Sequence, residues 1–196
     1  MDTEIKEFWI ERAAEIVRKG ENLSAYERNR TFLNVGGKDF LDISYLSGTD
    51  SDGDGRAVVA ADFRNNGQLD LVVRQVGGGP FLMFENRFPK KNYLKVSLRG
   101  SRSNRLGIGA RLKATCGDLT QVRDNFPVNS YQSQAPTIVH FGLGSFTTVP
   151  RLEVVWPSGH KQVFTDVVAN RHIRIDESKQ GKAAINVVVP GKVMAP

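Results

Sequence analysis

The sequence has a single cysteine, Cys116, among its 196 residues. One thiol excludes an internal disulfide framework and any zinc site that is built from cysteines. The flanking residues are ordinary for a strand, and a free cysteine on a strand is usually a small buried apolar side chain. We therefore expect Cys116 to lie in a core rather than to act as a reactive thiol.

Long apolar runs are also missing from the chain. The longest, residues 57–61 and 187–189, are far too short to span a bilayer, so no membrane span is predicted. Met1 runs directly into a mixture of acidic and basic residues, with no charged-then-apolar leader. The sequence therefore predicts no secretory signal peptide, and it leaves the localisation open.

Acidic residues are absent from residues 87–116, which hold nine Lys and Arg. Residues 1–54 carry seven basic and twelve acidic residues, a balance of −5, so the rest of the chain carries +11 behind the overall +6. The basic block is either an anion or nucleic-acid surface or the complement of the acidic first quarter. Only Phe88 and Tyr93 interleave with its charges and no known nucleic-acid module is legible, so nucleic acid is not the expected partner.

The chain begins with a pattern that predicts an amphipathic helix over residues 2–19. Apolar residues recur there with a helical period, and Gly20 follows as a stop signal. From residue 30 to residue 176 the pattern changes to short segments rich in Val, Leu, Ile and Phe, separated by Gly, Pro and Asp clusters. Many short strands with frequent turns predict a mainly β fold.

The predicted architecture has four parts. Residues 1–27 form an N-terminal amphipathic helix and linker, and residues 28–91 form one propeller-blade-like β repeat. Residues 92–177 form a β-sandwich or barrel-like C-terminal domain, and residues 178–196 form a tail. The blade-like repeat is indicated by an internal echo between residues 32–34 and residues 84–86, one blade-length apart.

The segment from Asp62 to Asp70 has the spacing of a calcium loop. Ca²⁺ takes about six to eight oxygen ligands, and a tight loop with carboxylates or amides at alternate positions aims them inward. Gly67 permits the sharp turn. The predicted ligands are three side chains, at positions one, five and nine, and the main-chain carbonyl of position seven: Asp62, Asn66, Asp70 and Gln68.

Position three of this loop is Arg64, where a calcium loop normally has Asp or Asn. That departure replaces a ligand with a cation and weakens the metal site. Without a metal, the same residues form a β-hairpin turn that is held by Asx hydrogen bonds. Both interpretations stay open, so Ca²⁺ is the one predicted cofactor and the structural turn is its alternative.

A second group of polar residues follows in the C-terminal half: Asn104, Arg105, Arg111, Ser133, Gln134 and His140. Strands can bring them together into a pocket for a carboxylate, a phosphate or a glycan, with Arg supplying forked donors. The alternative is structural, because Asn104 and Gly107 suit a turn and Ser133 and Gln134 can satisfy buried backbone groups. His140 is the one candidate for a catalytic residue, and no serine-hydrolase elbow is present.

Several motifs resemble a known family. Residues 54–73 are similar to the FG-GAP/VCBS repeat found beside ASPIC/UnbV domains, and the stretch after them resembles ASPIC/UnbV itself. The resemblance covers roughly residues 27–177. The matching pieces of the second part are Ser103-Asn104-Arg105, Gly107-Ile108-Gly109-Ala110-Arg111, Ser133-Gln134, His140 to Gly144, Val154 to Gly159, and Asn170.

The resemblance implies a calcium-associated and often extracellular protein, as in the cartilage acidic protein group. UnbV-type members also occur with enediyne biosynthesis genes, and the resemblance implies no agreed catalytic residues. The chain departs from the pattern at Arg64, and it lacks the long run of repeats that normally precedes the domain.

From these observations we expect a non-catalytic binding or interaction module, supported by Ca²⁺, that recognises a protein, a glycan or an anionic small molecule. The alternative is an enzyme or biosynthetic accessory protein that uses Arg111, Gln134 and His140. The sequence identifies neither the ligand nor the oligomeric state.

Overall fold

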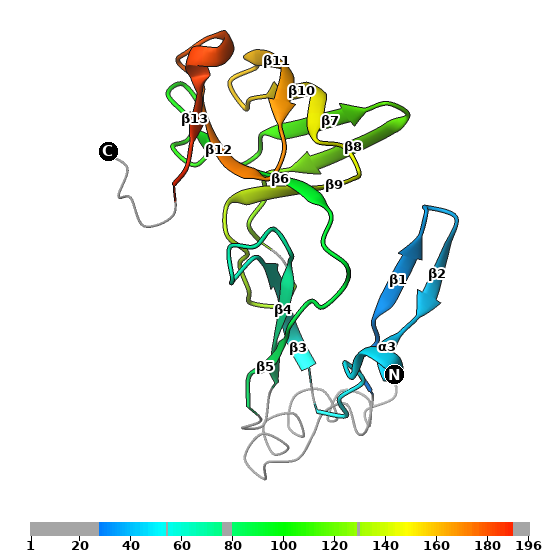
Figure 1. Ribbon diagram of the computed structural model, residues 1–196. Helices are drawn as coiled ribbons and strands as arrows, with labels where there is room; N and C mark the ends of the chain where they lie inside the picture. The colour runs from blue at the N-terminus through cyan, green and yellow to red at the C-terminus, as the bar shows by residue number, and fades with distance from the viewer. Residues whose placement is uncertain (1–27, 54, 76–79, 129, 190–196) are drawn as a thin grey trace, which may run out of the picture. The chain divides into compact units, whose positions relative to one another are not determined.

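The computed structural model describes residues 28–53, 55–75, 80–128 and 130–189 (Figure 1). Strands dominate this part of the chain, which confirms the predicted mainly β fold. The helix predicted over residues 2–19 lies outside the described residues. Within them, no helix combines the length and the apolar character that a bilayer crossing requires.

The chain divides into two compact units. The first contains the described residues up to Val59 together with Leu71–Glu85 and Ser130–Ser133, and the second contains Ala60–Asp70, Asn86–Asn129 and the described residues from Gln134 onward. Each unit is described by itself below.

The first unit contains a hairpin, a short helix and most of a three-stranded sheet. The hairpin strands pair antiparallel, and the sheet has the order β3-β4-β5. Three strands are one fewer than a propeller blade has, so the described residues do not support the predicted blade. The elements are β1 (Phe32–Val35), β2 (Asp39–Asp42), α3 (Ser44–Ser47), β3 (Gly55–Ala61), β4 (Asp70–Gln75) and β5 (Leu82–Phe84).

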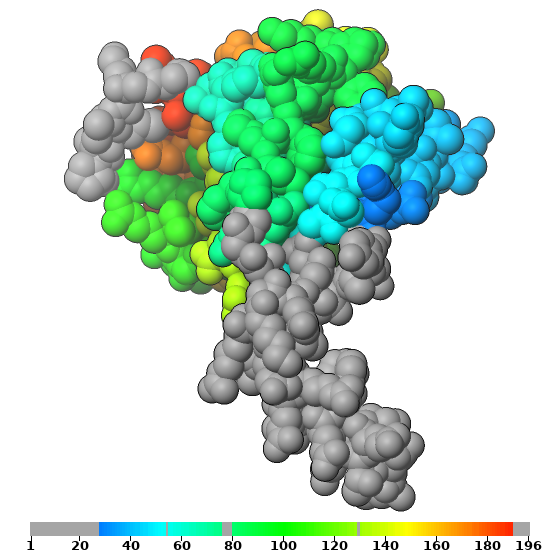
Figure 2. Space-filling view, turned by 90° about the horizontal axis from the view of Figure 1, so that it is seen from below, coloured from blue at the N-terminus to red at the C-terminus, as the bar shows by residue number. Residues whose placement is uncertain are grey.

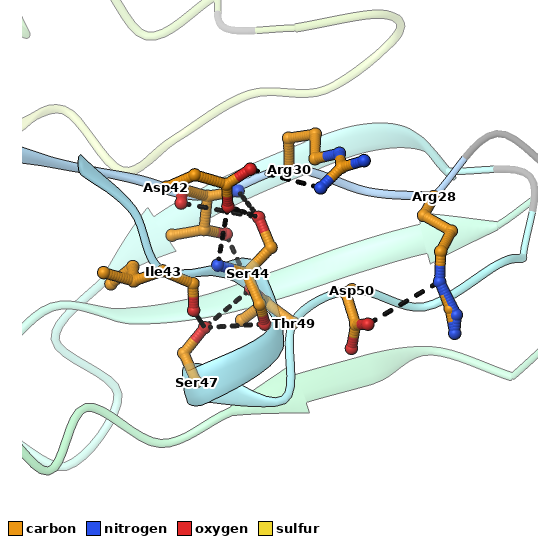
Figure 3. A network of polar contacts seen from close by, with 9 residues as sticks. Arg28, Arg30, Asp42, Ile43, Ser44, Ser47, Thr49 and Asp50 are labelled. Atoms are coloured by element: carbon orange, nitrogen blue, oxygen red, sulfur yellow. Dashed lines mark hydrogen bonds and ion pairs between the residues drawn. The ribbon is translucent and has the colours of Figure 1, made fainter. Parts of the chain in front are cut away.

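Polar contacts hold the base of the hairpin (Figure 3). The amide of Ser44 donates to Asp42 Oδ1 over 2.9 Å, and the amide of Thr31 donates to Ser44 Oγ over 2.8 Å. Arg30 pairs with Asp42 at 3.1 Å. The hydrogen bonds from Ser44 and the charge of Arg30 hold the pKa of Asp42 below its usual value. Side chains of the hairpin, blue in Figure 2, stand at the surface, and Phe40 is 64% exposed.

The second unit contains two four-stranded sheets. One is antiparallel throughout and has the order β11-β10-β7-β8. The other has the order β13-β12-β6-β9, and its β12–β6 pair is parallel. The elements are β6 (Asn92–Arg99), β7 (Arg111–Cys116), β8 (Leu119–Asp124), β9 (Ile138–Gly144), β10 (Thr148–Val155), β11 (Lys161–Val168), β12 (Arg171–Asp176), the 3₁₀ helix η2 (Gly181–Ala184) and β13 (Ile185–Val187).

Both sheets contribute to one hydrophobic core. Alternate residues of β7 are buried, as expected for a strand with one face toward a core, and Cys116 is among them. Leu94 and Val96 come from β6 of the other sheet, and Trp156 is the largest fully buried side chain. The core position expected for Cys116 is therefore confirmed. The described strands do not close into a barrel.

Candidate functional site

The loop from Asp62 to Asp70 joins β3 to β4, and its backbone amides form hydrogen bonds with side chains of the loop itself. The carboxylate of Asp62 accepts hydrogen bonds from the amides of Asn66 and Gly67, each over 2.9 Å. The amide of Gln68 donates to Asn66 Oδ1 over 2.9 Å. These are Asx-type contacts, in which a short polar side chain takes up backbone donors that the turn leaves free.

The loop lies against β6 and β9 through Gly67. A Cβ atom at this position would lie 2.0 Å from the ring of Tyr93, and the φ angle of Gly67 is +87°, so glycine alone fits. His140 Nε2 lies 2.8 Å from the carbonyl oxygen of Gly67, and its ring stacks with that of Tyr93 at a centroid distance of 6.0 Å. Side chains of β6 and β9, two neighbouring strands of one sheet, therefore contact the turn.

His140 donates to the loop as a neutral imidazole. A carbonyl oxygen only accepts, so the contact with Gly67 requires the proton on Nε2. Burial lowers the pKa of His140, and the hydrogen bond to Gly67 only partly opposes that shift. The ring is uncharged at neutral pH, and its Nε2 proton is already committed to the loop.

Asp62 forms a buried ion pair with Lys95 of β6. Lys95 Nζ lies 2.6 Å from Asp62 Oδ2 and 3.2 Å from Asn65 Oδ1. The side chains of Lys95 and Asp62 are 8% and 3% exposed. Burial raises the pKa of Asp62, but the bonds from Lys95 and from the two amides outweigh burial and leave the pKa below its usual value.

Asp70 is paired in the same way with Arg64. Arg64 Nη2 lies 2.8 Å from Asp70 Oδ1, and Arg64 Nε lies 3.2 Å from Oδ2, so the guanidinium binds both carboxylate oxygens. The amide of Asn86 adds a third bond of 2.9 Å. The Asp70 side chain is fully buried, yet these donors outweigh the effect of burial and hold its pKa below the usual value.

These contacts test whether the loop fits Ca²⁺. Both carboxylates that would bind the ion face a cation of the chain itself, and each already accepts three hydrogen bonds. Among the described residues, no group of three or more His, Cys, Asp and Glu side chains is placed to hold a metal. The arrangement of the residues does not fit a resident Ca²⁺ ion.

A pocket of about 330 Å³ lies beside this loop in the second unit. Asn170, with a φ angle of +57°, donates its amide to the carbonyl of Tyr93 over 2.7 Å, and its side chain binds Asn92 over 2.8 Å. The described lining carries ammonium, amide and phenol groups and no carboxylate: Asn66, Lys90, Lys91, Asn92, Tyr93, Gly144 and Asn170. This chemistry suits an anionic or hydroxyl-rich ligand.

The six polar residues predicted as a pocket have separate local partners. Asn104 bridges a turn, because its side chain binds both the amide and the carbonyl of Ile108. Arg105 is exposed, and its carbonyl accepts from Gly100. Arg111 pairs with Asp124 on the neighbouring strand at 2.7 Å.

The remaining members of that set lie elsewhere in the chain. Ser133 falls in the first unit, and Gln134 forms an isolated β-bridge with Val128. His140 sits on β9, in the sheet that does not contain Arg111. Of the predicted residues, the structure brings together Asp62, Asn66, Gln68, Asp70 and His140, all in or against the loop.

Two charged residues outside the predicted set, Lys95 and Glu177, are buried and make several hydrogen bonds. Lys95 lies on a central strand between buried apolar neighbours, which is an unusual place for a lysine and was a signal available in the sequence. Glu177 accepts hydrogen bonds from the amides of Ser101, Arg102 and Ser103 at 2.7–2.8 Å. No local pattern reveals this arrangement, because the three amide donors lie 74 to 76 positions from Glu177 in the chain.

The second unit is similar to a known family. Residues 100–182 match the family model described as ASPIC and UnbV. The match spans β7 to β12 and therefore includes strands of both four-stranded sheets. A comparison with curated proteins gave no match.

The ASPIC/UnbV segment contains the serines that hold Glu177. The hydroxyl groups of Ser103 and Ser158 bind Glu177 Oε1 at 2.8 and 2.6 Å. Gly107 of the same segment has a φ angle of +63°, and a Cβ atom there would lie 2.7 Å from Leu98. Ser103, Gly107 and Ser158 of this segment therefore shape its turns and their packing.

Proposed function

We propose that the chain is a non-catalytic binding module whose pocket beside the 62–70 loop receives an anionic ligand. The ligand class is a glycan or a small molecule that bears carboxylate, sulfate or phosphate groups. The observation that carries the proposal is the lining of this pocket, where Lys90 and Lys91 stand among amide side chains and no described carboxylate.

The distribution of charge supports the same ligand class. Within the basic block of residues 87–116, Lys95 is neutralised by Asp62 and Arg111 is paired with Asp124. Lys90 and Lys91 are exposed at the pocket instead, where their charge remains available to a partner. Lysine binds phosphate and sulfate as a point charge, and neighbouring amides supply directional donors.

His140 has a structural role in this proposal. Its Nε2 proton is held by the Gly67 carbonyl and its ring stacks on Tyr93, which lines the pocket, so the imidazole supports the loop and the pocket wall.

The wider family assignment is part of this proposal. We infer that residues 28–91 are a divergent FG-GAP/VCBS-like repeat of the kind found in the cartilage acidic protein-like family. The support is the sequence pattern of residues 54–73, upstream of the matched ASPIC/UnbV segment.

Isothermal titration of the full chain tests the pocket. The probes are a sulfated hexasaccharide, its unsulfated counterpart and inorganic pyrophosphate, which separate a glycan from a small-molecule source of the anion. Lys90→Ala/Lys91→Ala should weaken binding of the anionic probe by at least about tenfold, the equivalent of about 1.4 kcal/mol. Lys113→Ala/Lys161→Ala removes the same charge from β7 and β11 and should leave affinity within about threefold.

Two results contradict the proposal. If both double variants lose affinity equally, binding reflects overall charge and the pocket has no special role. If the wild-type chain binds neither anionic probe, the pocket is not an anion site.

A further inference from the structure

We propose that Lys95 and Arg64 take the place of a calcium ion in the 62–70 loop, so that the loop is held closed without metal. This inference concerns the loop alone and does not rest on the proposed ligand of the neighbouring pocket.

The charges of the loop balance without an ion. Asp62 and Asp70 bring two negative charges, and the ammonium of Lys95 and the guanidinium of Arg64 bring two positive charges, the same as one Ca²⁺. Each cation sits directly on one carboxylate, at 2.6 and 2.8 Å. A divalent cation added to this loop would meet a net charge of zero together with two fixed positive groups.

The oxygen atoms that a calcium ion needs are also occupied. Asp62 accepts from Asn66, Gly67 and Lys95, and Asp70 accepts from Arg64 and Asn86. Ca²⁺ requires about six to eight oxygen ligands at close range. Metal binding would therefore break several charge-assisted hydrogen bonds and expel the two cations.

Burial fixes the ammonium of Lys95 in the position that a metal ion would take. Its side chain is 8% exposed and lies on the central strand β6, so the ammonium cannot move into solvent without leaving the Asp62 carboxylate buried and unpaired. Leaving a buried charge without its partner is strongly destabilising. Lys95 is thus fixed in the fold, in contrast to a metal ion that exchanges with solvent.

Thermal unfolding of the full chain in EGTA and in excess CaCl₂ tests the proposal. The wild type should melt at the same temperature in both buffers. Lys95→Met, which keeps an unbranched side chain but removes its charge, should lower the melting temperature by about 6–12 °C in EGTA. Lys113→Met, the matched control on β7, should shift it by less than about 3 °C, because that lysine is 47% exposed and its ion pair measures 3.9 Å.

A double variant tests the replacement itself. Arg64→Asn/Lys95→Met removes both cations and restores an amide at position three of the loop. Its melting temperature should rise on addition of CaCl₂, and EGTA should reverse the rise.

Three outcomes overturn the proposal: a wild-type melting temperature that rises in CaCl₂, a Lys95→Met variant that melts with its control, or a folded double variant with no response to CaCl₂. If the double variant does not fold, the wild type and the Lys95→Met variant still decide the matter.

Discussion

At the scale of single residues, the second unit depends on charged side chains that are buried with several donors. Glu177 is the clearest case, because three backbone amides and two serine hydroxyls converge on its carboxylate. Burial raises the pKa of Glu177, but these donors outweigh it and hold the pKa far below the usual value. The carboxylate thereby ties residues 101–103 to the end of β12.

Glu177→Gln should lower the free energy of unfolding by about 2–3 kcal/mol at neutral pH, because hydrogen bonds to a charged acceptor are lost. The folded-state pKa lies below the unfolded value, so this stabilisation is present above the ordinary carboxyl range and disappears as the pH falls through the folded-state pKa. Urea denaturation at neutral and acidic pH measures the loss of stability and its dependence on pH.

Glu153→Gln is the control. It removes the ion pairs with Arg151 and Lys113 and should lower the free energy of unfolding by less than about 1 kcal/mol. Equal costs for the two variants would contradict the prediction.

His172 should make stability fall in mild acid. Burial and the nearby charge of Lys95 lower its pKa to about 4, from the ordinary 6.5. Between these values the unfolded chain binds a proton that the folded chain does not, so stability falls as the pH drops from 6.5 toward 4. His172→Gln should flatten this part of the profile in urea denaturation. A His172→Gln profile as steep as that of the wild type would refute the assignment.

At the scale of elements, the 62–70 loop shows how a short turn is fixed from outside. Its own Asx bonds shape it, but Gly67 against Tyr93, His140 on the Gly67 carbonyl and Lys95 on Asp62 determine where it lies. The loop and the two strands β6 and β9 therefore act as one packed element.

Gly67→Ala should destabilise the packed element that the 62–70 loop forms with β6 and β9. Its Cβ atom would overlap the ring of Tyr93 in a backbone conformation with φ at +87°, at a cost of about 2 kcal/mol or more. The melting temperature should drop, and hydrogen exchange in the loop should quicken. Gly142→Ala on β9 is the control, because nothing lies within 4 Å of its Cβ position. A variant at Gly67 that is as stable as the one at Gly142 would argue against the close packing.

The same elements show what the sequence predicts and where prediction stops. Short apolar segments separated by Gly, Pro and Asp clusters predict the β character of the second unit, since this pattern depends on neighbours in the chain. The Asx turn at Asp62 is local as well. The Lys95–Asp62 pair joins positions 33 apart, and the bonds from the amides of residues 101–103 to Glu177 join positions 74 to 76 apart, so the sequence does not reveal which residues pair.

At the scale of the whole molecule, the two units differ in how they are stabilised. The hydrophobic core cluster of buried residues lies entirely in the second unit. Among the described residues of the first unit, the buried side chains are polar, such as Ser44 and Thr49, and both strands of the hairpin are exposed. Apolar burial, the main stabilising contribution to folding, is therefore concentrated in the second unit.

Hydrogen exchange should reproduce this contrast. Amides of β6, β7, β10 and β12 should exchange most slowly, at the rate of global unfolding, because they lie in central strands over the core. Amides of β1 and β2 should exchange orders of magnitude faster. Mass spectrometry of peptides from the full chain measures both sets. Equal protection of the hairpin and the core strands would contradict this division of stability.

The parallel pairing of β6 with β12 has a consequence for synthesis on the ribosome. Tyr93 and Asn170, which meet at one end of this pair, are separated by 77 positions in the chain. When β6 leaves the exit tunnel, its neighbour in the sheet does not yet exist, and one edge of the strand stays open until β12 follows. Contacts of such long range form slowly, because a large loop must close before any of them is made. The β6–β12 pair, and with it the second sheet of the unit, can therefore be completed only after nearly all of the second unit has emerged.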